Sequence, residues 1–237
     1  MRGKWICAAL AGGTLLLLLY GAAAGRQAAQ VFGVGGSLPT LVIDAGHGGF
    51  DGGAVGANGT TEQDINLSVS NSVRALCGLF GRPAAMTRMN REALDYVPGR
   101  SVRENKVADI KARERIVKEI KNPVFLSIHL NKFEDAKYYG AQVFYSKNHP
   151  DSRTLAEMTQ SALIHGIENE NIRRAKPAAP AIYLMKNLDC PAVIVECGFL
   201  SNPEEERKLC DPGYQKQLAL CIFNGYQTYL KEEMDED

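Results

Sequence analysis

Three short apolar runs in this sequence each lead to a residue that can bind a metal ion or carry a proton. The runs and the residues that follow them are 41–43 with His47, 124–128 with His129, and 191–195 with Glu196. Runs of this kind are typical of strands that are covered on both faces of a parallel sheet. Segments with the apolar spacing of helices lie between them. The sequence therefore predicts an α/β fold in which a mostly parallel central sheet lies between helical layers, in a single catalytic domain.

The other expected elements follow from periodicity and from turn residues. A helix begins near Glu62, because Thr60 and Thr61 offer capping hydroxyls and apolar residues then recur at spacings of three and four. Further helices are expected over 108–120, 152–167 and 214–230, with a short one starting at 203, and further strands over 83–87, 140–146 and 181–185.

The candidate site lies where the predicted strands end. Parallel sheets bind ligands beyond the carboxyl ends of their strands, and His47, His129 and Glu196 all fall there, with Glu62 in the first turn of the next helix. Each residue alone has an ordinary structural explanation, such as a carboxylate that suits a helix dipole. Together, two His and one Glu form a known ligand set for catalytic zinc, which leaves one coordination position for water and one further carboxylate to carry protons.

Charge and the amino terminus indicate where the chain acts. Lys+Arg and Asp+Glu both number 27, so the net charge does not indicate a nucleic-acid partner. Arg2 and Lys4 precede an almost uncharged run that ends at Ala24, which predicts a signal peptide or membrane anchor over 1–24. We expect a flexible tether over 25–38, a catalytic domain over 39–232 and a frayed acidic tail over 233–237, with an extracytoplasmic location, either membrane-anchored or secreted.

The remaining reactive residue types have simpler interpretations. Beyond Cys7 in the leader, the five cysteines form an odd set without a C-x-x-C pair, which argues against a disulfide framework, and most are expected to be buried apolar residues. Cys197 has no His near it in the sequence and is disfavoured as a nucleophile. His149 and His165 are interpreted as surface residues, and Arg113 as one charge among many on a solvated helix face.

Five motifs extend this interpretation: DAGHGGFDGGAVG, TEQDINL, FLSIHLN, IYLMKN and PAVIVECGFLSNPEEERKL. In order and spacing they resemble the zinc-dependent N-acetylmuramoyl-L-alanine amidases of the third amidase family, over nearly the whole chain from Thr40 to Leu230. The single leader, the lack of wall-binding repeats and the stretch Arg173–Lys176 are most similar to the spore-cortex amidases of endospore-forming bacteria.

The resemblance implies a role for each site residue. It implies zinc ligands at His47, Glu62 and His129, a catalytic carboxylate at Glu196, and a supporting role for Arg113 behind the site. Two positions depart from the family pattern without touching a ligand: Ala45 replaces the usual Pro, and Leu130 replaces a common Ala. The segment 147–180 holds too little beyond one helix to carry the inhibitory helix of some relatives.

The resemblance also implies peptidoglycan as the substrate, with hydrolysis of the bond between the lactyl group of muramic acid and L-alanine. In the cortex, this step would precede formation of muramic lactam. Some relatives need a protein partner for full activity, so an activating partner is possible here. The open alternatives are a vegetative cell-wall amidase, a zinc peptidase that acts on the stem peptide, and a catalytically silent wall-binding module.

Overall fold

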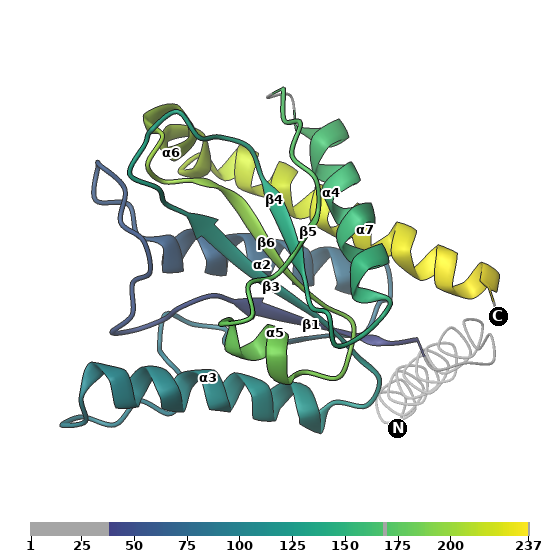
Figure 1. Cartoon of the computed structure of the whole chain (residues 1–237), viewed down its shortest axis with the longest axis horizontal. Coiled ribbons are helices and arrows are strands. Elements are labelled where there is room, and N and C mark those ends of the chain that lie inside the picture. The colour runs from purple at the N-terminus through teal and green to yellow at the C-terminus, as the bar shows by residue number, and fades with distance from the viewer. Residues whose placement is uncertain (1–37, 168–169, 237) are drawn as a thin grey trace, which may run out of the picture. The chain divides into compact units, whose positions relative to one another are not determined.

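The computed structural model describes residues 38–167 and 170–236, and the expected leader and most of the tether lie outside these residues. Six strands form one sheet in the order β2-β1-β3-β6-β4-β5 (Figure 1). The strands are β1 Thr40–Ala45, β2 Ala84–Met86, β3 Pro123–Asn131, β4 Gln142–Tyr145, β5 Lys176–Pro177 and β6 Ala192–Phe199. The helices are α2 Glu62–Leu79, α3 Val102–Glu119, α4 Ser152–Gly166, α5 Tyr183–Asn187, α6 Pro203–Leu209 and α7 Pro212–Glu236.

The sheet is mostly parallel, as the sequence predicts. β1 pairs in parallel with β2 and β3, and β3 pairs in parallel with β6, whereas β4 is antiparallel to β6. The register of the central strands sets His129 directly opposite Glu196, and sets Glu196 opposite Gln142 on β4. The carboxyl ends of β1, β3 and β6 therefore meet at one edge of the sheet.

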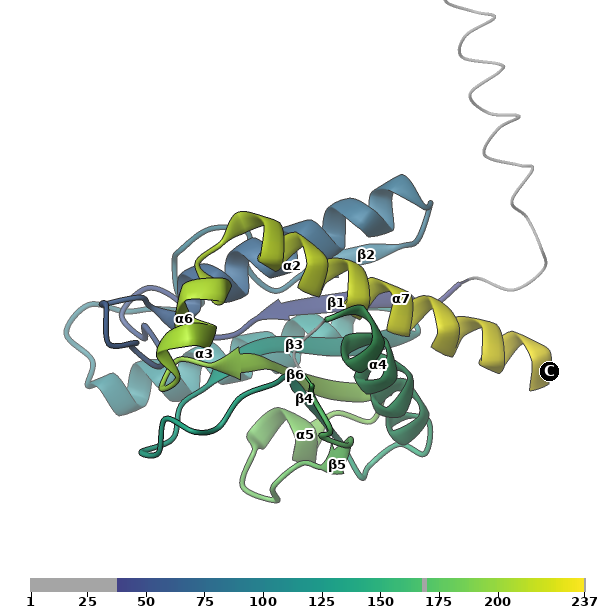
Figure 2. The same ribbon diagram turned by 90° about the horizontal axis from the view of Figure 1, so that it is seen from above.

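Two helical layers cover the sheet. On one face, α2, α4 and α7 enclose the larger apolar core, and α7 packs against both α2 and α4 (Figure 2). On the other face, α3 and α5 cover a smaller core around Phe125 and Ile194. The central strands are apolar on both faces because both faces are covered, which explains their uninterrupted hydrophobic runs. Among the described residues, no helix is long and apolar enough to cross a membrane.

One predicted strand is wrong. Residues 181–185 do not form a strand, because Tyr183–Asn187 is the short helix α5, and the edge strand is instead β5 at Lys176–Pro177. Leu184, Met185 and Leu188 are buried while the residues between them are more exposed, which is the spacing of a helix that lies on a sheet. A five-residue apolar run does not distinguish this spacing from that of a strand.

Several boundaries also differ from expectation. α3 begins at Val102 rather than near 108, because Ser101 and Glu104 form a capping box at its start. β3 and β6 continue past His129 and Glu196, so both residues lie within strands rather than after them. The carboxyl-terminal residues expected to be a frayed tail are helical as far as Glu236.

Candidate metal centre and active site

His47 lies in a tight turn directly after β1. Its backbone adopts φ 63°, a left-handed conformation that is uncommon for residues other than glycine. Two buried guanidinium groups hold this turn. Arg113 donates to the carbonyls of Ala45 and His47 at 2.9 and 2.6 Å, and Arg88 donates to those of Ala45 and Gly46 at 2.8 and 2.9 Å. The position of the imidazole therefore depends on backbone carbonyls that the two arginines hold by hydrogen bonds.

Glu62 is the first residue of α2 and is 3% exposed. Its Oε2 accepts a hydrogen bond from the backbone N–H of Ala54 at 2.8 Å. Its Oε1 accepts from the backbone N–H of Leu130 at 3.0 Å and from Nδ2 of Asn66 at 3.2 Å. A carboxylate with this many donors is held in one orientation.

His47, Glu62 and His129 form a compact group. Glu62 Oε1 lies 3.2 Å from His47 Nε2 and 2.9 Å from His129 Nδ1. One candidate ligand atom from each residue lies within 4.8 Å of the others, and this is the one such group in the described part of the chain. Two imidazoles and one carboxylate match the donor types and the number of protein ligands in catalytic zinc sites.

Two glycines make this close approach possible. A Cβ on Gly53, which has φ +69°, would lie 2.5 Å from Glu62 Oε2 and 2.7 Å from Cδ2 of His47. A Cβ on Gly46 would collide with the imidazole of His129. The glycine-rich motif therefore provides space for the three side chains as well as a turn.

Asp51 orients His47 from the far side of the ring. His47 Nδ1 lies 3.0 Å from Asp51 Oδ2, and Lys106 Nζ lies 3.0 Å from Asp51 Oδ1. A carboxylate on the second nitrogen of a metal-binding imidazole fixes its tautomer and raises its basicity. Burial alone would lower the pKa of His47, but the hydrogen bonds and negative charges of Asp51 and Glu62 raise this pKa to about 9. The metal-free group thus holds a proton that a metal ion must displace.

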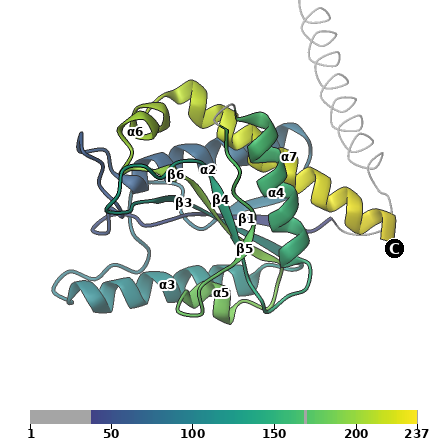
Figure 3. The same cartoon turned by 45° about the horizontal axis from the view of Figure 1, so that its top comes forward.

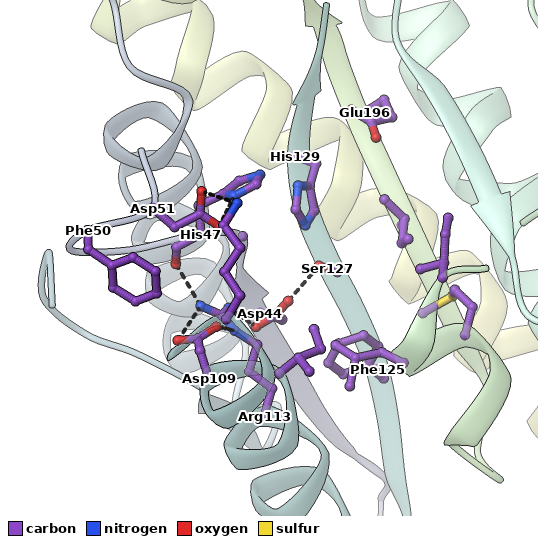
Figure 4. A pocket seen from close by; sticks show the side chains of 17 residues that line it. Asp44, His47, Phe50, Asp51, Asp109, Arg113, Phe125, Ser127, His129 and Glu196 are labelled. Carbon is purple, nitrogen blue, oxygen red and sulfur yellow. Dashed lines mark hydrogen bonds and ion pairs between the residues drawn. The ribbon is translucent and has the colours of Figure 1, made fainter. Parts of the chain in front are cut away.

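Glu196 lies beside this group on β6, at the end of a cavity of about 410 Å³ (Figure 4). The cavity lies between the sheet and α3 with α5, and its lining includes His47, His129 and Arg113. Glu196 Oε2 is buried and has no hydrogen-bond partner among the described residues. Burial raises the pKa of Glu196 to about 7, with a smaller opposing effect from His129. A carboxyl group in this state can both accept and donate a proton near neutral pH.

Arg113 is not on a solvated helix face as the charge pattern suggested. It is 2% exposed, and its guanidinium group pairs with Asp44 at 2.5 Å and with Asp109 at 2.7 Å. Asp44 also accepts hydrogen bonds from Ser127 and Thr87, both at 2.6 Å. Burial opposes the ionisation of Asp44, but Arg113 and the two hydroxyl donors outweigh it and hold the pKa below its ordinary value.

Sequence reasoning missed several residues that support the site, namely Asp44, Asp51, Asn66 and Arg88. Asp51 stands four residues after His47 and Asn66 four residues after Glu62, but those spacings alone do not show which side chains meet. Asp44 and Arg88 receive their partners from distant parts of the chain. Only the fold brings these groups together.

The other candidate residues lie away from this cluster. Cys197 is fully buried, and burial holds the pKa of its thiol far above the ordinary range, which argues against a nucleophile. The cysteines of the described region are free, and all except Cys210 are buried. His149 is partly exposed and His165 is exposed, as expected for surface residues.

Comparison with known proteins agrees with this geometry. The N-acetylmuramoyl-L-alanine amidase family matches residues 41–228, which include every candidate site residue. The chain belongs to this family. It is therefore an N-acetylmuramoyl-L-alanine amidase, with peptidoglycan as its class of substrate.

Relatives of this amidase extend the comparison. The germination-specific N-acetylmuramoyl-L-alanine amidase of Bacillus subtilis is 35% identical over 82% of this chain and 81% of its own length. The CwlD amidase of Clostridioides difficile, solved in complex with the GerS lipoprotein, is 39% identical and superposes with a TM-score of 0.78 over 81% of this chain and 98% of that one. The amidase AmiC2 of Nostoc punctiforme is 27% identical, with a TM-score of 0.70 over 81% of this chain and 97% of that one.

Proposed function

We propose that this amidase hydrolyses the amide bond between N-acetylmuramic acid and L-alanine with one zinc ion held by His47, Glu62 and His129, and with Glu196 as the proton carrier. The observation that carries the proposal is the placement of three converging ligand atoms beside a cavity that also contains a buried, unpartnered carboxylate.

The residues fit a zinc ion by their chemistry and by their supports. Glu62 supplies an anionic oxygen that two backbone N–H groups already orient. Asp51 fixes the ring of His47, as carboxylates do for imidazole ligands of metals. When bound, zinc supplies a Lewis acid that polarises the substrate carbonyl and lowers the pKa of water to roughly 7.

Glu196 carries the proton between water and the leaving group. It accepts a proton from the attacking water and gives it to the amine of L-alanine as the C–N bond breaks. The products are a lactyl carboxylate on the glycan and a peptide with a free L-alanine amino terminus. A pKa of about 7 suits both halves of this exchange, because neither protonation state is strongly preferred at neutral pH.

The products test this reaction against its alternatives. Purified peptidoglycan treated with the enzyme should gain L-alanine amino termini while its glycan strands keep their length. New amino termini from other positions of the stem would indicate a zinc peptidase. Binding without any new termini would indicate a silent wall-binding module.

We also propose that the enzyme acts in maturation of the spore cortex, where its product would be converted to muramic lactam. The similarity to a germination-specific amidase and to CwlD supports this role. A vegetative cell-wall role is the alternative, since amidases that are not named for germination, such as AmiC2, are similar in structure over the same domain. Cortex from a deletion strain decides between them, because loss of muramic lactam is expected only for the cortex enzyme.

Location and partner belong to the same proposal. The apolar leader over 1–24 would carry the enzyme across a membrane, as an anchor or as a cleaved signal peptide. The solved complex of CwlD with the GerS lipoprotein supports a protein partner for this enzyme, and we propose that such a partner is activating. Fractionation of native cells tests the location, and full-length chain free in the cytoplasm would contradict it.

A further inference from the structure

A second exposed surface lies beyond the carboxyl ends of β3 and β6. It is built from the loop between β3 and β4, which passes α6, and from the segment that leads into β5 (Figure 3). The exposed fractions of Phe133, Tyr138, Tyr139 and Ile172 are 45%, 37%, 43% and 90%. Together with Arg173 these residues are called the aromatic surface. Its shallow hollow, of about 220 Å³, is lined by both tyrosines, Ile172 and Arg173.

The aromatic surface is fixed from beneath by Phe199, the last residue of β6. The ring of Phe133 packs on Phe199 with centroids 5.3 Å apart. The guanidinium group of Arg173 lies over the same Phe199 ring, 4.6 Å from its centroid. Arg173 Nε donates to the carbonyl of Tyr139 at 2.7 Å, which joins the two segments. Buried Glu205 accepts from the backbone N–H of Gly140 at 2.9 Å. The rings of Phe133 and Tyr138 are therefore held by packing, and the backbone that carries Tyr139 is held by hydrogen bonds.

Two connections place this surface next to the active centre. Phe199 lies three residues after Glu196 on the same strand. Gln142 lies directly opposite Glu196 on β4, and its Oε1 accepts a hydrogen bond from Arg173 at 3.1 Å. Cross-strand neighbours have Cβ atoms about 4.5–5.5 Å apart, so one residue separates Arg173 from the proposed proton carrier.

We propose that the aromatic surface binds the glycan strand of peptidoglycan next to the muramic acid under attack. This rests on the proposed function, which places the scissile amide at Glu196. A stem peptide can enter the cavity of about 410 Å³, but a polysaccharide that continues in both directions must cross an open surface. Exposed rings suit the apolar faces of sugar rings, and exposed clusters of this kind mark binding sites.

Charges within the loop are balanced, and the basic excess of the aromatic surface comes from the segment that leads into β5. Within the loop, Lys132 and Lys137 are balanced by Glu134 and Asp135, and Lys137 pairs with Asp135 at 2.7 Å. Arg173, Arg174 and Lys176 of that segment give a local positive charge, which suits a glycan strand whose peptide-free muramic acids carry lactyl carboxylates. N-acetylated sugars offer hydroxyl and acetamido groups, for which the remaining N–H groups of Arg173 are suitable donors.

Removal of one exposed ring tests the proposal in the full chain purified in detergent. Tyr139→Ala should lower cleavage of intact peptidoglycan by roughly tenfold, because one ring's apolar contact is lost. Cleavage of a single N-acetylmuramic acid with its stem peptide should be unchanged, since that substrate has no neighbouring sugar to contact the surface. Tyr139→Phe, which keeps the ring, should restore cleavage of the polymer. Binding of peptide-free glycan strands should follow the same order.

Phe80→Ala is the matched control, because Phe80 is an aromatic residue that is 59% exposed at the far end of α2. Its activity on both substrates should equal that of the parent. Equal activity of Tyr139→Ala and parent on the polymer would overturn the proposal, as would an equal loss on both substrates. A loss that appears only when a protein partner is added would assign the surface to that partner instead. Failure of the proposed function looks different, because the parent itself would then release no L-alanine termini from either substrate.

Discussion

Replacing Glu62 or Glu196 with Gln, one at a time, should have different effects, because the two carboxylates have different surroundings. Both oxygens of Glu62 accept backbone N–H groups, so the NH₂ group of Glu62→Gln must face one of these donors. An unsatisfied buried donor costs about 1–3 kcal/mol, and the anionic metal ligand is lost as well. We expect Glu62→Gln to be less stable and to lose zinc and activity together.

Glu196→Gln should behave differently. Glu196 Oε2 has no partner in the described structure, so the amide breaks no hydrogen bond, and a neutral group replaces a carboxyl that burial already disfavours as an anion. Zinc content should stay at about one ion per chain, because the three proposed ligands are unchanged. Activity should fall by roughly 10² to 10⁴, which is about 3 to 5 kcal/mol of transition-state stabilisation.

Three measurements on each purified variant provide the assay: metal content, urea unfolding and release of L-alanine amino termini from a muropeptide. Glu204→Gln is a matched control, because Glu204 is an exposed glutamate whose nearest charge is Lys208 on the same helix. It should retain zinc, stability and activity. A Glu196→Gln enzyme that keeps its zinc and cleaves at near the parent rate would refute the role of Glu196 as proton carrier.

Other predictions concern the network and the metal. Arg113→Met should destabilise the fold by about 3–5 kcal/mol in urea unfolding, because it leaves Asp44 buried without its cation; an unchanged midpoint would contradict this. The pKa of Asp44 is lower in the folded chain than its ordinary 3.8, so its ionised form stabilises the fold above that pH and the contribution is lost as pH falls through the lowered pKa. The stability difference between the parent and Asp44→Asn should therefore shrink on acidification from pH 7 to about 3. Chelation should abolish activity, and zinc added back at pH 7 should restore it. Zinc binding should release about one proton, since the pKa of His47 in the metal-free site is raised to about 9. Calorimetry in buffers of different ionisation enthalpy measures that proton.

The sequence predicted the sheet well because its signal is local. A run of apolar residues followed by a glycine turn or a polar residue identifies a parallel strand and places its carboxyl end to within a few residues, and these ends must meet at one edge. His47, His129 and Glu196 do meet there, from three neighbouring strands. The roles assigned to them remain predictions, since only the metal and activity measurements test those.

What the sequence did not predict depends on contacts between distant segments. The helix α5 was interpreted as a strand because its apolar run is too short to show a period, and only its contact with the sheet reveals which residues are buried. Arg113 was interpreted as a surface charge because α3 is highly polar. Its acidic partner Asp44 lies 69 residues away in the sequence, on β1, so nothing local distinguishes Arg113 from its exposed neighbours.

The arginines behind the site explain how a proposed metal ligand can occupy an unfavourable turn. The left-handed backbone of His47 costs roughly 1–2 kcal/mol relative to an ordinary conformation, and a turn of this kind persists only where its surroundings determine it. Arg113 contacts the carbonyl of His47 with the same guanidinium group that pairs with Asp44, and Arg88 binds the preceding carbonyls in the same way. A Lys offers one point charge and cannot span these acceptors, whereas the planar guanidinium group presents several donors at fixed angles. The buried ion pair thus determines the position of the imidazole, and this positioning accounts for a charged network that lines the cavity without supplying a proposed metal ligand.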